Sequence, residues 1–408
     1  MMYDLKSNGS CDLTQLYDNS YDDKTLLDTL KLTIKCWRSS DKIYKILKYD
    51  KNYLTEDKIQ TTGLFRSVIC KDGKILVFSP PKGIGFKKFT QIYSPNDCIA
   101  QEYIEGTMIN MFYDQDEWEI ATRSSVGGKV SFFMQTNNKE STTFRTMFLE
   151  ACNTVNLDFD KLDKKICYSF VLQHPKNRIV IPFTTPKLYL VACYSINDYS
   201  ITEVPCSSQK ESLSESTVLF PDVYPFTDFN ELQEKWLSGN SDYTHVGVML
   251  HHSSGVRSKI RNPNYEYVRR LRGNQPKKQY RYLVLRNQGQ VSDYLKYYPE
   301  ERNEFDLFRK HIHNFTNTLH TNYIKCYIKK KAPLKEFSYQ YRAHMFQLHQ
   351  DYINNLREKQ GSITRSFVIN YINNMHPAKL MYSLNYHLRK NIQDINIIDE
   401  EKNGAVNV

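Results

Sequence analysis

The spacing of apolar residues changes along this chain, and the change limits the folds open to it. Up to about residue 290, short apolar runs of strand length alternate with turn residues such as Asp72-Gly73, a pattern typical of β-hairpins. Beyond that point, apolar residues such as Phe305, Phe308 and Ile312 recur every three or four positions, as on one face of a helix. The sequence therefore predicts an α+β fold, with antiparallel sheets followed by an all-helical C-terminal domain.

The length of 408 residues is enough for two to four domains. We expect a flexible N-terminus at 1–20, a strand-rich domain at 21–290, a basic helical domain at 291–390 and a flexible tail at 391–408. Within the strand-rich domain, the Ser-rich polar segment 207–216 is expected to form a surface loop.

Local patterns predict the individual elements. Helical spacing of apolar residues indicates helices at 24–53, 144–152, 305–323 and 334–356, and Pro377 opens a further one. Short apolar runs, several of them joined by turn residues, indicate strands. The expected strands are 65–70, 74–79, 107–113, 117–122, 129–134, 165–173, 178–183, 188–194, 245–251, 256–261 and 280–286.

Composition also limits where the protein works. No apolar stretch approaches the roughly 20 residues that a membrane helix needs, and the first residues lack the pattern of a signal peptide. The nine cysteines are an odd number without a C-x-x-C pair, which favours reduced thiols and no zinc site. We expect an intracellular protein, cytoplasmic or nuclear, that is not secreted and has no membrane partner.

Positive charge is concentrated in the C-terminal third. Residues 257–390 contain 26 Lys and Arg against 9 Asp and Glu, whereas the rest of the chain contains 29 against 36. Within this region Arg257, Lys259 and Arg261 alternate along an expected strand and would share one face. Three cations on one face are unfavourable unless an anion lies among them, and phosphates are the usual anion. RNA is therefore the expected partner, and protein partners are unknown; a solvated charged surface is the alternative.

Six short motifs follow one another between about Phe65 and Tyr282. They are Arg66-Ser67-Val68-Ile69-Cys70, Ser79-Pro80-Pro81-Lys82, Tyr103-Ile104-Glu105-Gly106-Thr107, Pro175-Lys176-Asn177-Arg178-Ile179-Val180, Val246-Gly247-Val248-Met249 and Lys259-Ile260-Arg261. Their order and spacing resemble those of the phage-type RNA ligase 1 family, which belongs to the covalent nucleotidyltransferases together with DNA ligases and mRNA capping enzymes. The resemblance implies a nucleotidyltransferase-like, ATP-grasp-like domain in which antiparallel sheets form a cleft.

The resemblance also implies site residues. The candidates for binding nucleotide or phosphate are Arg66, Glu105, Gly106, Arg123, Lys259 and Arg261. The family uses its C-terminal helical domain to recognise structured RNA, and the charge surplus adds a basic track. The candidates for binding RNA are Arg257, Arg269, Arg270, Arg272, Lys277 and Lys278.

The chain departs from the family where the chemistry takes place. The family attacks the α-phosphate of ATP with a lysine amine, and Tyr103 stands at that position here. The family also uses two glutamates for metal and nucleotide, and these align with Val171 and Val246. The catalytic residue therefore stays unassigned, and no metal ligand is predicted.

Three functions remain open from the sequence. The first is an RNA ligase-like protein that binds nucleotide and RNA phosphates but is catalytically degenerate. The second is an active ATP-dependent RNA ligase, with ATP and Mg as cofactors, whose nucleophile is Lys82, Lys87, Lys88 or Tyr103. The third is a structural or interaction protein with no nucleic-acid role.

Overall fold

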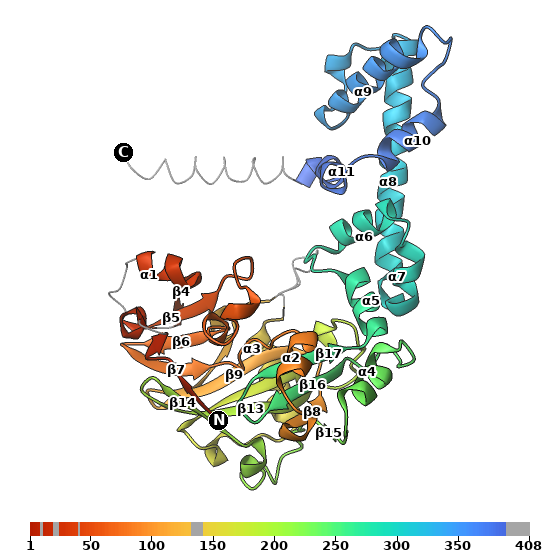
Figure 1. The fold of residues 1–408 in the computed structure, drawn as a ribbon. Coiled ribbons are helices and arrows are strands. Elements are labelled where there is room, and N and C mark those ends of the chain that lie inside the picture. Colours follow the sequence, from red (N-terminus) through yellow and green to blue (C-terminus); the bar gives the residue numbers. More distant parts are fainter. Residues whose placement is uncertain (9–10, 19–23, 40, 132–141, 389–408) are drawn as a thin grey trace, which may run out of the picture. The chain divides into compact units, whose positions relative to one another are not determined.

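The computed structural model describes residues 1–8, 11–18, 24–39, 41–131 and 142–388. Its chain forms two compact units, Met1–Arg270 and Leu271–Val408, and the boundary falls inside α5 (Pro263–Arg272). The first unit contains antiparallel sheets and the second is helical (Figure 1). The predicted α+β class is confirmed.

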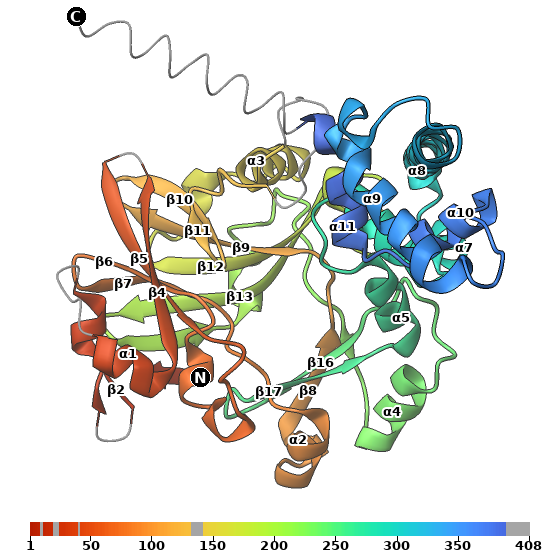
Figure 2. The same ribbon diagram turned by 90° about the horizontal axis from the view of Figure 1, so that it is seen from above.

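A seven-stranded antiparallel sheet is the largest layer of the first unit (Figure 2). Met147 and Phe148 of helix α3 (Phe144–Thr154), which the sequence predicted, belong to the core cluster on this sheet, with Met111 and Phe170. The strand order is β1 (Met2–Asp4), β14 (Ser200–Val204), β13 (Lys187–Asn197), β12 (Ile166–Gln173), β9 (Thr107–Asp114), β10 (Glu117–Thr122) and β11 (Ser125–Val126).

A four-stranded sheet corrects the prediction of a helix over residues 24–53. Only α1 (Lys24–Leu30) is helical there, and the chain continues as β4 (Leu32–Ser39) and β5 (Lys42–Tyr49). Strand β5 also pairs with β6 (Val68–Lys71), which pairs with β7 (Lys74–Phe78) in the predicted hairpin. The apolar spacing suggested a helix because the pairing of β5 with β6 joins distant parts of the chain and leaves no local pattern. This pairing places Tyr44, Ile46 and Leu47 of β5 in the core.

A second four-stranded sheet has the order β15 (Val223–Tyr224), β8 (Cys98–Glu102), β16 (Gly247–His252) and β17 (Arg257–Arg261). Two helices, α2 (Phe86–Ile92) and α4 (Phe229–Leu237), contribute Phe89, Phe229, Leu232 and Trp236 to the core cluster that also holds Val248 and Ile260 of this sheet. The predicted hairpin of β16 and β17 is confirmed.

The N-terminal residues differ from the flexible segment expected at 1–20. Strand β1 pairs with β14, and a small hairpin joins β2 (Ser7–Asn8) to β3 (Cys11–Asp12). Leu5, Leu13 and Tyr17 are buried in the core. The sequence suggested a polar tail because these apolar residues are widely spaced among polar ones.

Three predicted strands are not strands. Residues 129–131, the described part of the strand expected at 129–134, are irregular. Residues 178–183 form bends without a ladder partner, although the neighbouring β12 is present as predicted. Residues 280–286 lie in helix α6 (Lys278–Asn287), which buries Arg281, Tyr282 and Leu285. The Ser-rich segment 207–216 includes the end of a 3-10 helix (Cys206–Gln209) and buries Leu213. Residues 132–134 of an expected strand and 391–408 of the expected tail lie outside the described residues.

The second unit is built from helices around an aromatic core. Phe305, Ile312, Phe315 and Leu319 of the long helix α8 are buried, as their spacing predicted. Helix α8 spans Arg302–Tyr323. The other α-helices that lie wholly in the described part of this unit are α6 (Lys278–Asn287), α7 (Val291–Tyr297), α9 (Tyr339–Asp351), α10 (Arg365–Asn373) and α11 (Pro377–Leu384). Among the described residues, no helix is long and apolar enough to cross a membrane.

A buried ion pair joins the seven-stranded sheet to the β4–β7 sheet. Lys71 Nζ donates to both carboxylate oxygens of Asp114, at 2.8 and 2.6 Å, and the Tyr44 hydroxyl donates to the same carboxylate at 2.9 Å. Burial alone would raise the pKa of the Asp114 carboxyl, but the hydrogen bonds from Lys71 and Tyr44 hold that pKa below its usual value.

We predict that Lys71→Met lowers the free energy of unfolding by roughly 3 kcal/mol, because it leaves a buried carboxylate without its main cation. The pKa of Asp114 is lower in the folded protein than in the unfolded chain. Its ionised carboxylate therefore contributes fully to the free energy of unfolding above the unfolded-state pKa near 3.9, and this contribution is lost as the pH falls through the folded-state pKa. Urea unfolding should therefore show a smaller loss on acidification in the variant than in the unmutated protein. Lys74→Met, on the exposed turn of the same hairpin, is the control, and equal stability of the two variants would contradict the prediction.

Candidate phosphate-binding site

Tyr103 lies directly after β8, beside the two strands that follow β8 in the sheet. Its backbone N–H donates to the carbonyl oxygen of Gly247 on β16 at 3.2 Å. Arg261 on β17 donates from Nη2 to the Tyr103 hydroxyl oxygen at 3.0 Å, and the guanidinium carbon lies 5.4 Å from the centre of the tyrosine ring. Two predicted site motifs, far apart in the sequence, therefore meet at this hydroxyl.

Strand β17 presents its cations in the alternating pattern that the sequence predicted. Ser258 and Ile260 are buried, whereas Arg257, Lys259 and Arg261 are more exposed and alternate with them. Within the described part of the chain, the Nε atoms of Arg257 and Arg261 are buried without a hydrogen-bond acceptor. Two buried guanidinium donors are thus available to an anion at this face.

Further cations come from the β4–β7 sheet and from the turn after β10. Arg123 donates from Nε to the carbonyl oxygen of Arg66 at 3.3 Å, and its guanidinium lies over the ring of Tyr49. Lys48 of β5 donates to the Ser124 hydroxyl at 3.1 Å. Together with the cations of β17 near Tyr103, these residues form what we call the cation cluster: Lys48, Lys51, Arg66, Lys82, Arg123, Lys259 and Arg261.

The members of the cation cluster repel one another. The charge of Arg123, followed by burial and by the charges of Arg66 and Lys82, lowers the pKa of the Lys51 amine. The Lys259 side chain is exposed overall, yet desolvation of its ammonium group and the nearby charges of Arg261 and Lys82 lower its pKa as well. Such lowered pKa values indicate a local excess of positive charge, which a bound anion would relieve.

Acidic groups neutralise only part of this charge. Within the described residues, Arg261 is the member of the cation cluster that forms an ion pair, with the Glu266 carboxylate. Glu266 also bonds Arg269 at 3.3 Å. The remaining members lie near one another without such a partner in the described part of the chain, so the positive potential of the cluster persists.

Glu105, a predicted nucleotide-binding residue, is buried, and its carboxylate binds the backbone. It accepts hydrogen bonds from the N–H groups of Val180, at 3.0 and 3.2 Å, and of Ile181, at 3.0 Å. Burial raises the pKa of this carboxyl despite those bonds. The same bonds explain why residues 178–183 form no strand, since two of their donors are used by a side chain. A nucleotide contact by Glu105 stays a prediction.

Gly106 and Gly247 permit close backbone approaches next to Tyr103. Gly106 has φ of +154°, and a Cβ there would lie 2.5 Å from the carbonyl oxygen of Leu172. Gly247 has φ of +131°, and a Cβ there would lie 2.1 Å from the carbonyl oxygen of Ile260. A larger residue at 247 would push β16 away from β17, which holds Arg261, and a larger residue at 106 would collide with β12.

The six predicted RNA-binding cations are placed in different surroundings. In the first unit, Arg257 belongs to β17, Arg269 pairs with Glu266, and Arg270 donates to the Glu266 carbonyl oxygen. In the second unit, Arg272 is buried and Lys278 pairs with Glu304, while Lys277 is exposed. Their role in binding RNA stays a prediction, and the burial of Arg272 suits a packing role.

Sequence motifs did not reveal Lys48 and Lys51 as neighbours of the site. Lys48 lies on β5, inside the stretch that local spacing predicted to be a helix. Their approach to Arg123 depends on the pairing of β5 with β6 and on the packing of the sheets. The lysines of β5 recur every three residues, so their spacing gives no strand signal. The β-branched and aromatic residues Ile43, Tyr44 and Ile46 are the signal that could have indicated a strand there.

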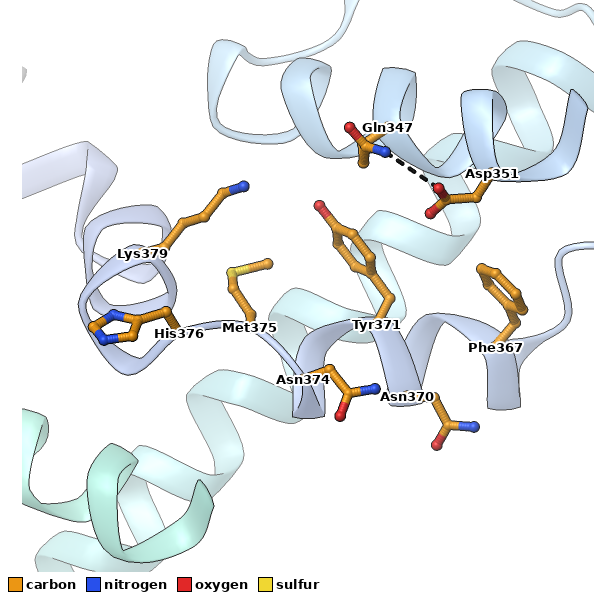
Figure 3. A pocket seen from close by; sticks show the side chains of 9 residues that line it. All are labelled: Gln347, Asp351, Phe367, Asn370, Tyr371, Asn374, Met375, His376 and Lys379. Atoms are coloured by element: carbon orange, nitrogen blue, oxygen red, sulfur yellow. Dashed lines mark hydrogen bonds between the residues drawn. The ribbon is translucent and has the colours of Figure 1, made fainter. Parts of the chain in front are cut away.

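The second unit contains a separate cavity of about 570 Å³ between α9, α10 and α11 (Figure 3). Its lining combines amides and aromatic rings with one lysine, and Gln347 is hydrogen-bonded to Asp351 at 3.2 Å. None of the predicted site residues lines it. The lining residues are Gln347, Asp351, Phe367, Asn370, Tyr371, Asn374, Met375, His376 and Lys379.

Metal-binding groups are a separate question from the cations. In the ranges that the structure describes, no group of three or more His, Cys, Asp and Glu side chains is placed to hold a metal ion. Val171 and Val246, which align with the family's glutamates, are buried and apolar.

Two curated relatives share distant sequence similarity with the chain. The Immediate-early protein ICP-46 homolog of Invertebrate iridescent virus 3 is 26% identical over 200 residues, which are 47% of this chain and 40% of that protein. An RNA ligase of Rhodothermus phage RM378 is 29% identical over 108 residues, which are 24% of this chain and 23% of that protein. The matches thus cover less than half of either relative. No family model matches the chain.

Solved structures of ligases are also similar to this chain. A putative ATP-dependent DNA ligase from Aquifex aeolicus has a TM-score of 0.40 at 11% identity, over 81% of this chain and 79% of that chain. An RNA ligase of Naegleria gruberi, solved with ATP and manganese, has a TM-score of 0.34 at 11% identity, over 60% of this chain and 82% of that chain. The predicted resemblance to RNA ligases is confirmed as a distant sequence similarity.

We predict that Glu105→Ala destabilises the first unit by about 2 kcal/mol, because it leaves the buried N–H groups of Val180 and Ile181 without an acceptor. Glu105→Gln keeps one acceptor oxygen and should cost less than half as much. Thermal unfolding of both variants measures the difference. If the two variants have equal midpoints, the carboxylate does not anchor this segment.

Proposed function

We propose that the first unit binds the phosphate groups of nucleotides and RNA through the cation cluster, as an RNA ligase-like protein without the family's lysine nucleophile. One observation supports the proposal above the others. Arg261 Nη2 donates to the Tyr103 hydroxyl at 3.0 Å, and the Nε atoms of Arg257 and Arg261 are buried without an acceptor in the described part of the chain. The charge of Arg123 lowers the pKa of Lys51, whereas burial, followed by neighbouring charges, lowers the pKa values of Arg66 and Lys259.

The electrostatics of the cluster favour a polyanion. Holding several like charges together costs free energy in the unliganded protein, and this cost is relieved when phosphate oxygens come between them. Arginine side chains suit this role because the planar guanidinium can donate two parallel hydrogen bonds to one phosphate. The buried Nε donors of Arg257 and Arg261, which have no acceptor within the described residues, support this assignment.

The comparison with the phage RNA ligase supports the choice of ligand. Distant similarity to a protein named RNA ligase favours RNA ends and a nucleoside triphosphate over other polyanions. ATP is the proposed nucleotide, because the RNA ligase family that the motifs resemble uses ATP. Magnesium would enter with the triphosphate, because Val171 and Val246 offer no ligand.

The site lacks the group that the family's chemistry needs. A lysyl-nucleotide intermediate requires an amine at position 103, and no lysine occurs between Phe89 and Lys129. The site therefore binds phosphates without forming the family's usual intermediate. RNA contacts by Arg257, Arg269 and Arg270 of the first unit belong to the same proposal, and RNA contacts by Arg272, Lys277 and Lys278 are proposed separately for the second unit.

We predict that the double variant Lys259→Met, Arg261→Met weakens binding of a single-stranded RNA and of ATP. Two cations that neutralise phosphates are removed, so the slope of log K against log salt should fall by about 0.7 for each phosphate that is no longer neutralised. Fluorescence anisotropy with a labelled oligonucleotide, between low and physiological salt, measures both affinity and slope.

The control for this experiment is Lys74→Met, Lys165→Met, which removes the same charge from exposed positions of the first unit. It should leave the slope and the ATP affinity nearly unchanged. If the two double variants behave alike, binding is a property of net charge and the cluster has no special role. If the unmutated protein binds neither ATP nor RNA, the chain is a structural or interaction protein.

A further inference from the structure

The hydroxyl oxygen of Tyr103 is the atom on which the contacts of this site converge. Arg261 Nη2 donates to its hydroxyl oxygen at 3.0 Å, so a lone pair of that oxygen is already directed to a positive charge. The guanidinium of the same arginine lies over the ring. The backbone bond to Gly247 fixes where the side chain leaves the sheet. This tyrosine is held in place, and its oxygen lies at the cation cluster.

The surrounding cations stabilise the phenolate form of Tyr103 and so lower the pKa of its hydroxyl. Burial by itself would raise the pKa of Tyr103, but the charges of Arg261 and Lys259, the hydrogen bond from Arg261 and the charge of Arg66 lower it below the usual value. Buried tyrosines elsewhere in the first unit have the opposite shift: burial raises the pKa of Tyr44, Tyr168 and Tyr265. The hydroxyl of Tyr103 is therefore set apart by its cations.

We propose that Tyr103 is the covalent acceptor of a nucleotidyl group, taken from a nucleoside triphosphate bound in the cation cluster. The inference rests on the proposed function, because the triphosphate must bind there first. It extends that function from binding to group transfer, with an oxygen in place of the family's amine.

The step balances without a further reactant. The proton of the phenol passes to solvent, and the phenolate oxygen attacks the α-phosphorus. An oxygen–phosphorus bond forms, the bond from the α-phosphorus to the bridging oxygen breaks, and pyrophosphate leaves with the electron pair. Lys259, Arg66 and Arg261 are the cations placed to neutralise the charge that develops on the phosphate oxygens.

The product is an aryl phosphodiester, in which the leaving group of a second step would be a phenolate. Because a phenol is far more acidic than a sugar hydroxyl, this ester can still pass its nucleotidyl group to an RNA end. The amine of Lys259 is the competing nucleophile on the same face, since its pKa is lowered as well. An amine would give a phosphoramidate, which acid and hydroxylamine cleave, whereas the tyrosyl ester survives both. This difference in lability separates the two nucleophiles.

The test is incubation of the full chain with α-phosphate-labelled ATP or GTP and magnesium or manganese, followed by denaturing electrophoresis. We expect a label that survives acid and hydroxylamine, is reversed by pyrophosphate and maps to the peptide with Tyr103. Its rate of formation should rise with pH to a midpoint below the value near 10 of a free tyrosine.

Matched variants complete the design. Tyr103→Phe keeps the ring and should abolish the label, while Tyr189→Phe, at a half-buried tyrosine outside the cluster, should retain it. Lys259→Arg keeps a cation in the cluster and removes the competing amine, so a label that forms in this variant does not lie on residue 259. Tyr103→Lys should convert the label to an acid-labile one.

Each remaining outcome has a distinct meaning. An acid-labile label in the unmutated protein, or a label that persists in Tyr103→Phe, overturns the inference in favour of a lysine. Absence of label in a preparation that binds ATP, measured by equilibrium dialysis, overturns the inference and leaves the proposed function standing. Absence of both label and binding overturns the two together.

Discussion

The register of three neighbouring strands is the constraint on which the candidate site depends. Strand β16 pairs with β8 and with β17, so that Val248 lies opposite Glu102 and Gly247 lies opposite Arg261. This register places Tyr103, the next residue after β8, within hydrogen-bonding distance of Arg261. A shift of one residue would turn the side chains of β17 to the other face and remove the cations from Tyr103. Gly247 makes the register possible, because its backbone passes too close to Ile260 for a side chain.

The other half of the cluster depends on how the sheets are joined. The buried contact of Lys71 and Tyr44 with Asp114 fixes the β4–β7 sheet to the end of β9, and the same sheet provides Lys48 and the segments around Arg66. Arg123, in the turn after β10, then bonds the backbone of Arg66. The contact of Lys71 and Tyr44 with Asp114, which stabilises the packing of the two sheets, therefore also brings the like charges of the cation cluster together. Such crowding of charge is typical of positions that a ligand or a reaction uses.

Our proposal sets Tyr103 at the position of the lysine of the family that the motifs resemble, and these two residue types respond differently to the same cations. A lysine among these cations would lose its proton, because the neutral amine relieves the repulsion. A tyrosine in the same place also loses its proton more readily, but it becomes an anion that attracts Arg261 and Lys259. Both residues are therefore driven toward their nucleophilic form by one set of charges.

The sequence by itself determined the local and periodic features: the α+β class, most strands, the long helix α8, the alternation of cations along β17 and the tyrosine at position 103. It also contained the order of motifs that resembles RNA ligases. It did not determine β4 and β5, whose apolar spacing suits a helix until pairing with β6 decides otherwise, nor the engagement of Glu105 with Val180 and Ile181. Only the tertiary structure brought Lys48 and Lys51 to Arg123 and set Arg261 against Tyr103. Contacts between residues so far apart in the chain arise from sheet pairing and packing, and a local pattern carries no information on which distant strand will be the partner.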